Sequence, residues 1–327
     1  MAHAHERSQG KKAKQAKEAA TAALINDSSR ASQKLAEARK TAAKASLDAA
    51  QVTEAFNAVK NDPVLAVFTG LRQISAEYKL PAATALVLAA GRGERMRPLT
   101  DATPKPMLTL GRRPLLAWHL RRLAQAGHRH VVVNTAWLED QVVQGLGSHW
   151  TDPDDKHLKL AITFSKEGQD FGDALETAGG IARALPLLAE VFWVVAGDVF
   201  APEFGFEQAQ MTALAASPDR ARLWLVPNPV HHPQGDFGLV GDRVLNWVEP
   251  APGPRWTFST LGLYKQAFFT PPVCDLTPGN PEGVQAALAP MLRRGMDLGW
   301  VSGEVYPQTW VDVGTPQRLE ELRSLHG

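Results

Sequence analysis

Short hydrophobic runs alternate with amphipathic stretches between about residue 84 and residue 200. The apolar runs are short and bounded by polar residues or glycine, which predicts buried β-strands. These strands are Ala85–Ala90, His130–Asn134, Leu158–Phe164 and Phe192–Ala196. Between them, apolar residues recur as on one face of a helix, and the predicted helices are Pro114–Ala126, Trp137–Leu146 and Thr177–Ala189. Such alternation is typical of an α/β fold with a parallel sheet.

Beyond Asp198 the pattern changes to a series of β-like runs. These runs are Arg222–Val226, Phe237–Leu245, Leu245–Glu249, Trp256–Tyr264 and Leu298–Val305. Proline and glycine are frequent through residues 250–283, as in loops. A final amphipathic segment, Pro316–Leu325, predicts a closing helix. We therefore expect the second half of the chain to add further strands and to make the central sheet mixed.

The first 82 residues differ in composition from the rest of the chain. Ala, Lys, Glu, Gln and Ser dominate residues 1–60, and apolar side chains larger than alanine are few. Such a sequence favours helix but has little to bury, so a helical or partly disordered extension is predicted, with a coiled-coil or partner-binding arm as the alternative. Residues 63–80 predict an amphipathic helix that docks on the body or on a protein partner. The predicted domains are the extension, 1–82, and the body, 83–327.

The composition and net charge are those of a globular protein and do not favour a nucleic-acid-binding or membrane protein. Hydrophobic residues make up 44% and charged residues 21% of the chain, as in soluble globular proteins. The net charge of +1 gives no case for binding nucleic acid or a membrane by bulk attraction. No apolar run approaches the roughly 18–20 residues of a membrane span, and no secretory signal is recognisable. The lone Cys274 cannot form an internal disulfide, which suits a cytoplasmic location.

The stretch Leu86–Lys105 (LVLAAGRGERMRPLTDATPK) carries the strongest indication of chemistry. A buried strand runs into Gly91 and Gly93, which let backbone N–H groups approach an anion closely. Arg95 and Lys105 supply charge-assisted bonds to phosphate oxygens, and the prolines on either side of Lys105 fix its backbone. The loop matches neither of the common glycine motifs, GxxxxGK[ST] and GxGxxG, so phosphate binding is inferred from the whole cluster.

A strand-end acid, Asp198, is the first candidate metal ligand. The carboxyl ends of parallel strands meet at one edge of a sheet, so we expect the Gly91 loop, Asn134 and Asp198 to converge there. A carboxylate beside bound phosphates is a natural Mg²⁺ ligand, and one or two carboxylates are usual. The second candidate is Asp312, in the segment WVDVGT.

A loop between two predicted strands, Asn228–Asp236, contains adjacent histidines at His231 and His232. No further His or Cys stands at ligand spacing, so the pair does not predict a zinc site. Asp236 can contact a sugar, and Trp310 is the tryptophan that we expect to line a pocket.

Several motifs together resemble the sugar-1-phosphate nucleotidylyltransferases. They are LAAGRGERMRPLT followed by TPKPM, ETAGGIARALP, AGDV and WVDVGTPQRL, and they cover about residues 84–325. Within that family, GERMRPLT, AWL at 136–138 and NPVHHPQGDFGL are most similar to the N-acetylmuramate α-1-phosphate uridylyltransferases of peptidoglycan recycling. Mannose-1-phosphate guanylyltransferases and glucose-1-phosphate uridylyl- or thymidylyltransferases share most of these motifs and are the alternatives.

The resemblance implies a Rossmann-like nucleotide-diphospho-sugar transferase fold. It also implies Mg²⁺-dependent transfer of a nucleotidyl group, UMP from UTP, to a sugar 1-phosphate. In this comparison Arg95 holds the triphosphate with the glycine loop, Lys105 meets the α-phosphate, and Asp198 and Asp312 bind the metal. The nucleotide-binding residues so implied are Ala90, Gly91, Gly93, Glu94, Arg95, Lys105, Gly179, Gly180 and Ala196. The catalytic residues are Arg95, Lys105 and Asp198, and the sugar-binding residues are Asp236, Glu249, Gly262 and Trp310.

The chain departs from the family pattern in three places. Ala178 replaces a glycine of the frequent ETGGG sequence. Pro250 follows Glu249 where some relatives have a phosphate-binding lysine, for which Lys166 or Lys265 could substitute. At residues 259–262 the side chains are larger than those that the family usually has at the sugar pocket. A regulatory subunit that binds sugar nucleotides without turnover is the non-enzyme alternative, and the joint presence of cations and acids at this site argues against it.

Overall fold

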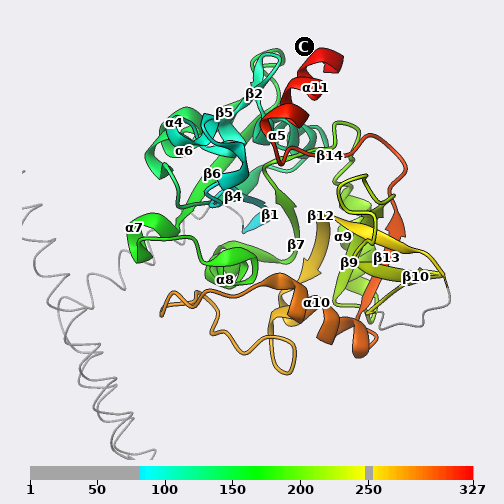
Figure 1. Cartoon of the computed structure of the whole chain (residues 1–327). Coiled ribbons are helices and arrows are strands. Elements are labelled where there is room, and N and C mark those ends of the chain that lie inside the picture. Colours follow the sequence, from blue (N-terminus) through cyan, green and yellow to red (C-terminus); the bar gives the residue numbers. More distant parts are fainter. Residues whose placement is uncertain (1–81, 247–252, 327) are drawn as a thin grey trace, which may run out of the picture. The chain divides into compact units, whose positions relative to one another are not determined.

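The computed structural model describes residues 82–246 and 253–326 of the chain. The expectations for the extension, including its helix at residues 63–80, and for Glu249 fall outside the described residues. By internal contacts the chain divides into Met1–Lys79 and Leu80–Gly327, and every element below belongs to the second unit. Figure 1 shows its elements coloured along the sequence.

A ten-stranded mixed sheet forms the centre of this unit. In its parallel part, β1 (Ala83–Leu88) lies between β7 (Leu188–Ala196) and β4 (His130–Thr135). The next strand is β6 (Lys159–Lys166), and the antiparallel β5 (His149–Thr151) forms that edge. The strands predicted in this half are confirmed, and β1, β4 and β7 are largely buried, whereas β6 is only partly so.

The second half of the chain extends the same sheet on the other side of β7. The long strand β12 (Arg255–Lys265) pairs antiparallel with β7 and with β9 (Ala221–Val226), and β13 (Val301–Val305) runs parallel to β9. The outer strands are β11 (Arg243–Leu245) and β10 (Phe237–Val240). The expected mixed α/β architecture is therefore confirmed.

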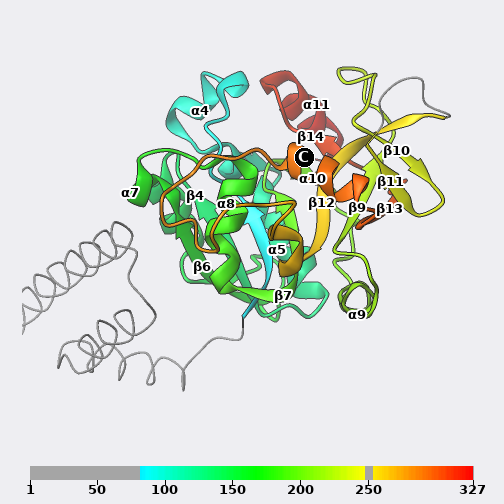
Figure 2. The same cartoon turned by 90° about the horizontal axis from the view of Figure 1, so that it is seen from below.

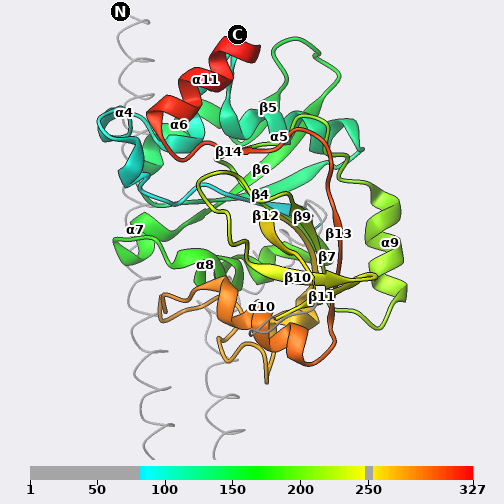
Figure 3. The same ribbon diagram turned by 45° about the vertical axis from the view of Figure 1, so that its right-hand side comes forward.

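Helices cover both faces of the sheet, as Figure 3 shows. On one face lie α5 (Leu115–Gln125), α6 (Glu139–Leu146) and α9 (Gln208–Ala216), and on the other α8 (Glu176–Ala184) and α10 (Leu288–Asp297). Successive side chains of β1 point to opposite faces of the sheet. Val87 therefore packs with the helices of the first face and Leu86 with those of the second. Each fully buried leucine contributes about 1.5–3 kcal/mol to this packing.

A third apolar cluster holds the C-terminal helix, α11 (Pro316–His326), against the first part of the body. Leu319 and Leu322 of α11 pack with Met96, Leu110 and Phe200. The small strands β14 (Val311–Asp312) and β8 (Val199–Phe200) pair antiparallel beside this cluster. Residues from the end of the chain are thereby brought next to the segment that follows β7. Figure 2 shows α11 and β14 from below.

Several element boundaries differ from the predictions. The helix predicted at Thr177–Ala189 ends earlier, because β7 begins at Leu188. The run Phe237–Leu245 is two strands, since Gly241 adopts a left-handed turn with φ 59°. Helices α9 and α10 were not predicted. The remaining short elements are η1 (Glu94–Met96), α4 (Leu99–Ala102), η2 (Lys105–Met107), β2 (Thr109–Leu110), β3 (Arg113–Pro114), α7 (Glu167–Phe171), η3 (Leu185–Leu187) and η4 (Gln266–Phe269).

Candidate active site

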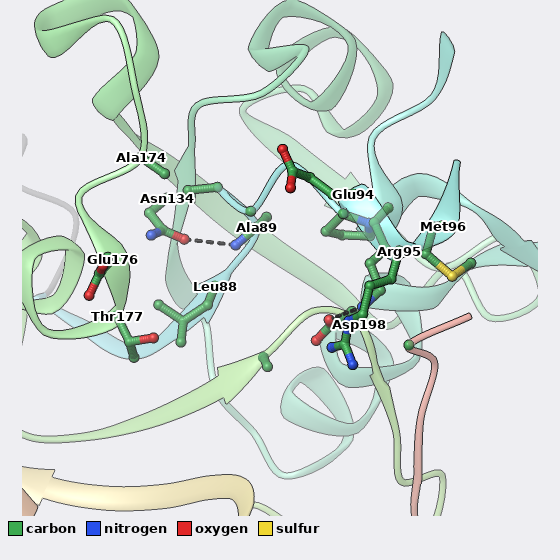
Figure 4. Close-up of a pocket in the computed structure, with 17 residues that line it drawn as sticks. Leu88, Ala89, Glu94, Arg95, Met96, Asn134, Ala174, Glu176, Thr177 and Asp198 are labelled. Carbon is green, nitrogen blue, oxygen red and sulfur yellow. Dashed lines mark hydrogen bonds and ion pairs between the residues drawn. The ribbon is translucent and has the colours of Figure 1, made fainter. Parts of the chain in front are cut away.

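A cavity of about 480 Å³ opens where the parallel strands end. The register aligns Leu88 of β1 with Asn134 of β4 and Ala196 of β7, so the loops that follow these strands meet at one edge. The lining of this first cavity, drawn in Figure 4, is Leu88, Ala89, Ala90, Gly91, Gly93, Glu94, Arg95, Met96, Lys105, Pro106, Asn134, Ala174, Glu176, Thr177, Ala196, Asp198 and Gly314. The expected convergence of the glycine loop, Asn134 and Asp198 is thus observed.

The glycine loop has a fixed backbone at Gly93. This residue adopts the left-handed region with φ 66°, and its carbonyl accepts hydrogen bonds from the Met96 amide at 2.8 Å and the Thr100 hydroxyl at 2.8 Å. A β-carbon at this position would lie 3.1 Å from Cβ of Lys105. Gly93 is therefore required both by its φ angle and by the close approach of the lysine.

Arg95, in the 3₁₀ turn after this glycine, is exposed beside the cavity. Its guanidinium forms no ion pair or hydrogen bond with the residues of 82–246 and 253–326. Figure 4 shows the side chain on the same side of the cavity as Asp198. Arg95 is thus available to a bound anion.

Trp137 anchors the far side of the loop. Its Nε1 donates to the Thr100 carbonyl at 2.9 Å, and the guanidinium of Arg92 lies 4.3 Å from its ring centre. This tryptophan belongs to the AWL segment, but its role in holding the loop was not predicted. The hydrogen bond and the cation–π contact both restrict residues 92–100.

Lys105 and Asp198 form an ion pair in the wall of the cavity. The Lys105 Nζ lies 2.5 Å from Asp198 Oδ2, and the lysine side chain is only 10% exposed. A buried ammonium without a partner would be costly, so the carboxylate stabilises the cation in this position. The lysine is thereby held beside the glycine loop, with a positive charge at the cavity wall.

The two candidate metal aspartates are joined by backbone pairing. Asp312 in β14 lies opposite Val199 of β8, and the amide of Val313 donates to the Asp198 carbonyl at 3.1 Å. The Asp312 carboxylate itself is held by Arg318 and His231, and Gly314 is the residue of this segment that lines the cavity. The structure therefore brings the two segments together, with Asp312 at the margin of the cavity.

The donor set fits a magnesium ion that also binds phosphates. Within the described part of the chain no group of three or more His, Cys, Asp or Glu forms a metal site by itself. Mg²⁺ at nucleotide phosphates needs only one or two protein carboxylates and takes its other ligands from phosphate and water. Both Asp198, which lines the cavity, and Asp312, two residues before the lining residue Gly314, are hard oxygen donors, so the residues present suit that arrangement.

A buried carboxylate, Glu167, orders the opposite wall, and the sequence did not suggest it. Asn134 accepts the Ala89 amide at 2.7 Å and donates to Glu167 Oε1 at 2.7 Å, while Glu167 Oε2 accepts the Leu175 amide at 2.8 Å. Burial raises the pKa of Glu167, and these hydrogen bonds act in the opposite direction. The network ties the end of β1, the end of β4 and the start of α8 together.

Gly179 and Gly180 lie in α8 behind the cavity lining, whereas Glu176 and Thr177 face the cavity. A β-carbon at Gly179 would lie 2.5 Å from the Val284 carbonyl oxygen, and one at Gly180 would lie 2.6 Å from Glu167 Oε1. In the structure these glycines permit close packing of α8. Their implied role beside the base stays a prediction.

We expect Gly180→Ala to destabilise the protein. The new methyl group would collide with Glu167 and Asn134, and overpacking of this kind costs about 1–3 kcal/mol. The gain of about 1 kcal/mol in helix propensity offsets only part of that cost. Urea unfolding measures the difference, and Gly91→Ala is the control, since a β-carbon there meets no atom within 4 Å. Equal stability of both variants would contradict this account of α8.

A second cavity of about 540 Å³ adjoins the first. The two share Leu88, Glu176, Thr177 and Ala196 in their linings, so they lie side by side. The remaining lining of the second is Val194, Asp236, Phe237, Phe258, Thr260, Tyr264, Ala287, Leu288, Ala289 and Leu292. Its walls are mainly apolar, and Asp236 is the carboxylate of its lining that the first cavity does not share.

Two hydroxyl groups at the second cavity lack partners in the described part of the chain. They are Thr260 Oγ1 and Tyr264 OH, both buried. Thr260 and Glu176 also have positive φ angles, 65° and 57°. Unpaired donors and strained backbone at one cavity are typical of a ligand site.

The other residues predicted at the sugar site lie behind this lining. Gly262 makes room for the ring of Tyr264, since an added β-carbon would lie 2.6 Å from the Tyr264 hydroxyl. Trp310 donates from Nε1 to the Ser259 carbonyl at 3.0 Å and packs against the core. Neither residue lines the two cavities.

The two lysines considered as phosphate ligands have partners elsewhere. Lys166 donates to Gln169, and Lys265 donates to the Ser217 carbonyl at the other end of β12. Neither lines the two cavities. Cys274 is buried, and burial raises the pKa of its thiol.

The burial of His119 in α5 should make the stability of the folded protein fall at acidic pH. Complete burial lowers its pKa from 6.5 to about 4, although its Nε2–H donates to the Val199 carbonyl at 2.7 Å. The folded state therefore keeps this ring neutral, and its stability falls as the pH drops from 6.5 towards 4, by up to about 3 kcal/mol.

His119→Gln keeps a donor for Val199 but cannot be protonated in this range. We expect the variant to lose less stability than the parent between pH 7 and pH 5, as measured by urea unfolding at each pH. Identical losses would show that His119 does not cause the dependence.

Comparisons with known proteins agree with the fold. A family model described as nucleotidyl transferase matches residues 84–325. An N-acetylmuramate alpha-1-phosphate uridylyltransferase of Neisseria meningitidis is 45% identical over 74% of this chain and 98% of that protein. A mannose-1-phosphate guanylyltransferase of Mycobacterium tuberculosis is 33% identical over 71% of this chain and 61% of that protein.

A solved structure shares the fold. It is that of a Bacillus anthracis protein assigned as a glucose-1-phosphate thymidylyltransferase, in complex with sucrose. The TM-score is 0.60 at 19% identity, over 74% of this chain and 94% of that one.

Proposed function

The chain belongs to the nucleotidyl transferase family, as an enzyme of the sugar-phosphate nucleotidyltransferase class, and from that premise we propose that it transfers UMP from UTP to N-acetylmuramate 1-phosphate. The products would be UDP-N-acetylmuramate and pyrophosphate. The proposal includes Mg²⁺ as cofactor, a cytoplasmic location and a role in peptidoglycan recycling. In the described part of the chain, no helix is long and apolar enough to span a membrane.

One observation supports the proposal most strongly: the Lys105–Asp198 pair lies in the wall of the first cavity, beside the glycine loop, and a second cavity adjoins it. Lys105 and the glycine loop line the first cavity, while Asp236, Thr260 and Tyr264 line the second. Ala196, at the end of β7, lines both. The phosphates of two substrates would therefore meet beside Asp198.

The residues suggest an in-line displacement at the α-phosphorus of the nucleotide. The phosphate oxygen of the sugar phosphate forms the new P–O bond, and the bond to pyrophosphate breaks. Because both reactants are anions, the protein contributes mainly charge neutralisation and alignment. Lys105 would stabilise the charge that builds on the α-phosphate, and Arg95 would hold the leaving β- and γ-phosphates.

A metal held by Asp198 and Asp312 would supply further positive charge to the phosphates when bound. The attacking phosphate is already ionised at neutral pH, so no general base is required. The buried Glu167 network would keep the wall of the first cavity in place during these events.

The choice of uridine and of N-acetylmuramate is supported by the 45% identity to the Neisseria protein. The second cavity, of about 540 Å³, has room for an N-acylated sugar with a bulky substituent, and its apolar walls would pack against the methyl groups of the acetyl and lactyl substituents. Guanylyl transfer to mannose 1-phosphate is the alternative, given the 33% identity to the Mycobacterium protein.

Pyrophosphate release tests this proposal. UTP, dTTP and GTP would each be incubated with N-acetylmuramate 1-phosphate, N-acetylglucosamine 1-phosphate, glucose 1-phosphate and mannose 1-phosphate. The highest kcat/KM is expected for UTP with N-acetylmuramate 1-phosphate. Preference for GTP with mannose 1-phosphate would support the alternative, and binding without turnover of any pair would indicate a regulatory subunit.

A further inference from the structure

Two side chains outside the cavities hold the carboxylate of Asp312. Arg318 Nη1, from the first turn of α11, lies 2.6 Å from Asp312 Oδ2 and 3.0 Å from the Asp312 backbone carbonyl oxygen. His231 Nε2 lies 3.0 Å from the other carboxylate oxygen, Oδ1. Each carboxylate oxygen of Asp312 therefore has one side-chain partner, an arginine at Oδ2 and a histidine at Oδ1.

The contact with Arg318 is the more strongly fixed of the two. One guanidinium nitrogen binds both the carboxylate and the backbone of the same residue, and the Arg318 amide is itself capped by the Thr315 hydroxyl at 3.3 Å. The side chain is only 19% exposed. An arginine keeps its positive charge at all ordinary pH values, so the attraction between Arg318 and the Asp312 carboxylate does not depend on protonation of the arginine.

The contact with His231 is weaker by its geometry. The same Nε2 atom lies 3.2 Å from Arg318 Nη1 and 3.0 Å from Asp312 Oδ1. One ring nitrogen either donates or accepts a hydrogen bond, so it cannot satisfy both neighbours at once. His231 is also 37% exposed, and it lies next to Val230, which is 99% exposed. Displacing His231 from Oδ1 should cost little.

We propose that Arg318 is a positioning residue for the metal ligand Asp312, and that His231 covers the oxygen that the metal takes. This inference rests on the proposed function, because it assumes that Asp312 binds a divalent cation. Arg318 fixes Oδ2 and the backbone carbonyl of Asp312 and so sets the orientation of the whole carboxylate, two residues before Gly314, which lines the first cavity. Partners that orient a metal ligand in this way typically change metal affinity by about 10–100-fold when removed.

Arg323 provides a matched control on the same helix. Its guanidinium donates to the Thr109 carbonyl at 2.9 and 3.0 Å, so it also fastens α11 to the body. Arg323→Gln should therefore reproduce any general loosening of α11 without touching Asp312.

The test measures the binding of Mn²⁺ to the full-length chain in the presence of α,β-methylene-UTP. Electron paramagnetic resonance detects the Mn²⁺ that remains free. The analogue alone is the blank. We expect Arg318→Gln to raise the apparent Kd for Mn²⁺ about tenfold, Arg318→Lys to restore part of the affinity, and Arg323→Gln to bind as the parent does. His231→Ala should bind Mn²⁺ at least as tightly as the parent.

Asp312→Asn separates the failure of this inference from failure of the proposed metal site. If Asp312→Asn weakens Mn²⁺ binding while Arg318→Gln binds as the parent does, the positioning role is wrong and the metal site stands. Equal losses in Arg318→Gln and Arg323→Gln would likewise overturn it. If the parent binds no better than the blank, or Asp312→Asn has no effect, both proposals fail.

Discussion

Lys105→Ala is expected to reduce kcat by about 10²–10³-fold, the usual cost of removing one group that stabilises charge in a transition state. Lys105 is buried in the cavity wall and already paired with Asp198 at 2.5 Å, so its ammonium is held where the α-phosphate is expected. Steady-state pyrophosphate release with UTP and the preferred sugar phosphate measures the loss.

Two controls separate chemistry from folding in this experiment. Lys166→Ala removes a lysine that lines neither cavity and should leave kcat unchanged. Thermal unfolding of Lys105→Ala should show a folded protein, since the mutation leaves Asp198 partly exposed to solvent rather than deeply buried. Turnover of a folded Lys105→Ala protein at the parent's rate would refute the role of this lysine.

Asp198→Asn should be the second severe variant, with kcat lowered by about a thousandfold. The change removes one carboxylate of the proposed metal site, and charge stabilisation by a bound metal is worth several kcal/mol, at about 1.36 kcal/mol for each factor of ten. It also removes the anionic partner of Lys105 while keeping the shape of the side chain.

The dependence on Mg²⁺ concentration identifies the cause of that loss. If Asp198 binds the metal, the concentration of Mg²⁺ that gives half-maximal rate should rise in Asp198→Asn. Asp219→Asn is a control away from the site, because Asp219 pairs with Arg243 near the outer strands. An unchanged Mg²⁺ dependence in Asp198→Asn would place the metal elsewhere.

The parallel half of the fold could be predicted from the sequence because its signals are local. Apolar runs such as Phe192–Ala196 and the glycines after β1 fix where strands end, and the ends of parallel strands share one edge. The position of Asp198 beside the glycine loop follows from that rule alone. Asp312 was also a candidate metal ligand, but its proximity could not be derived in this way, since it depends on the pairing of β14 with β8.

Other parts of the site depend on contacts that leave no local pattern. Glu167 follows a strand in an ordinary polar segment, and only its burial against Asn134 shows its role. Arg318 resembles any polar residue of an exposed helix until its distance to Asp312 is known. Thr260 adopts a positive φ angle that a β-branched residue rarely shows, which no propensity rule would suggest.

In α8, glycines that were expected to lie beside the nucleotide base allow close packing within the protein. The glycines of ETAGG were expected beside the base by resemblance, and the structure places them where α8 meets Val284 and Glu167. The residues of this segment that line the cavity are Glu176 and Thr177. A small residue therefore indicates a close approach, but it does not reveal whether protein or ligand makes that approach.

The most direct test of the central claim follows the α-phosphorus itself. UTP labelled with ³²P at the α-position would be incubated with the full-length chain, Mg²⁺ and N-acetylmuramate 1-phosphate, and the products separated by chromatography. The account predicts that the label moves into a UDP-sugar with release of one equivalent of unlabelled pyrophosphate, and that Lys105→Ala nearly abolishes this transfer. Label that stays in UTP, or that appears only in UMP, would contradict it.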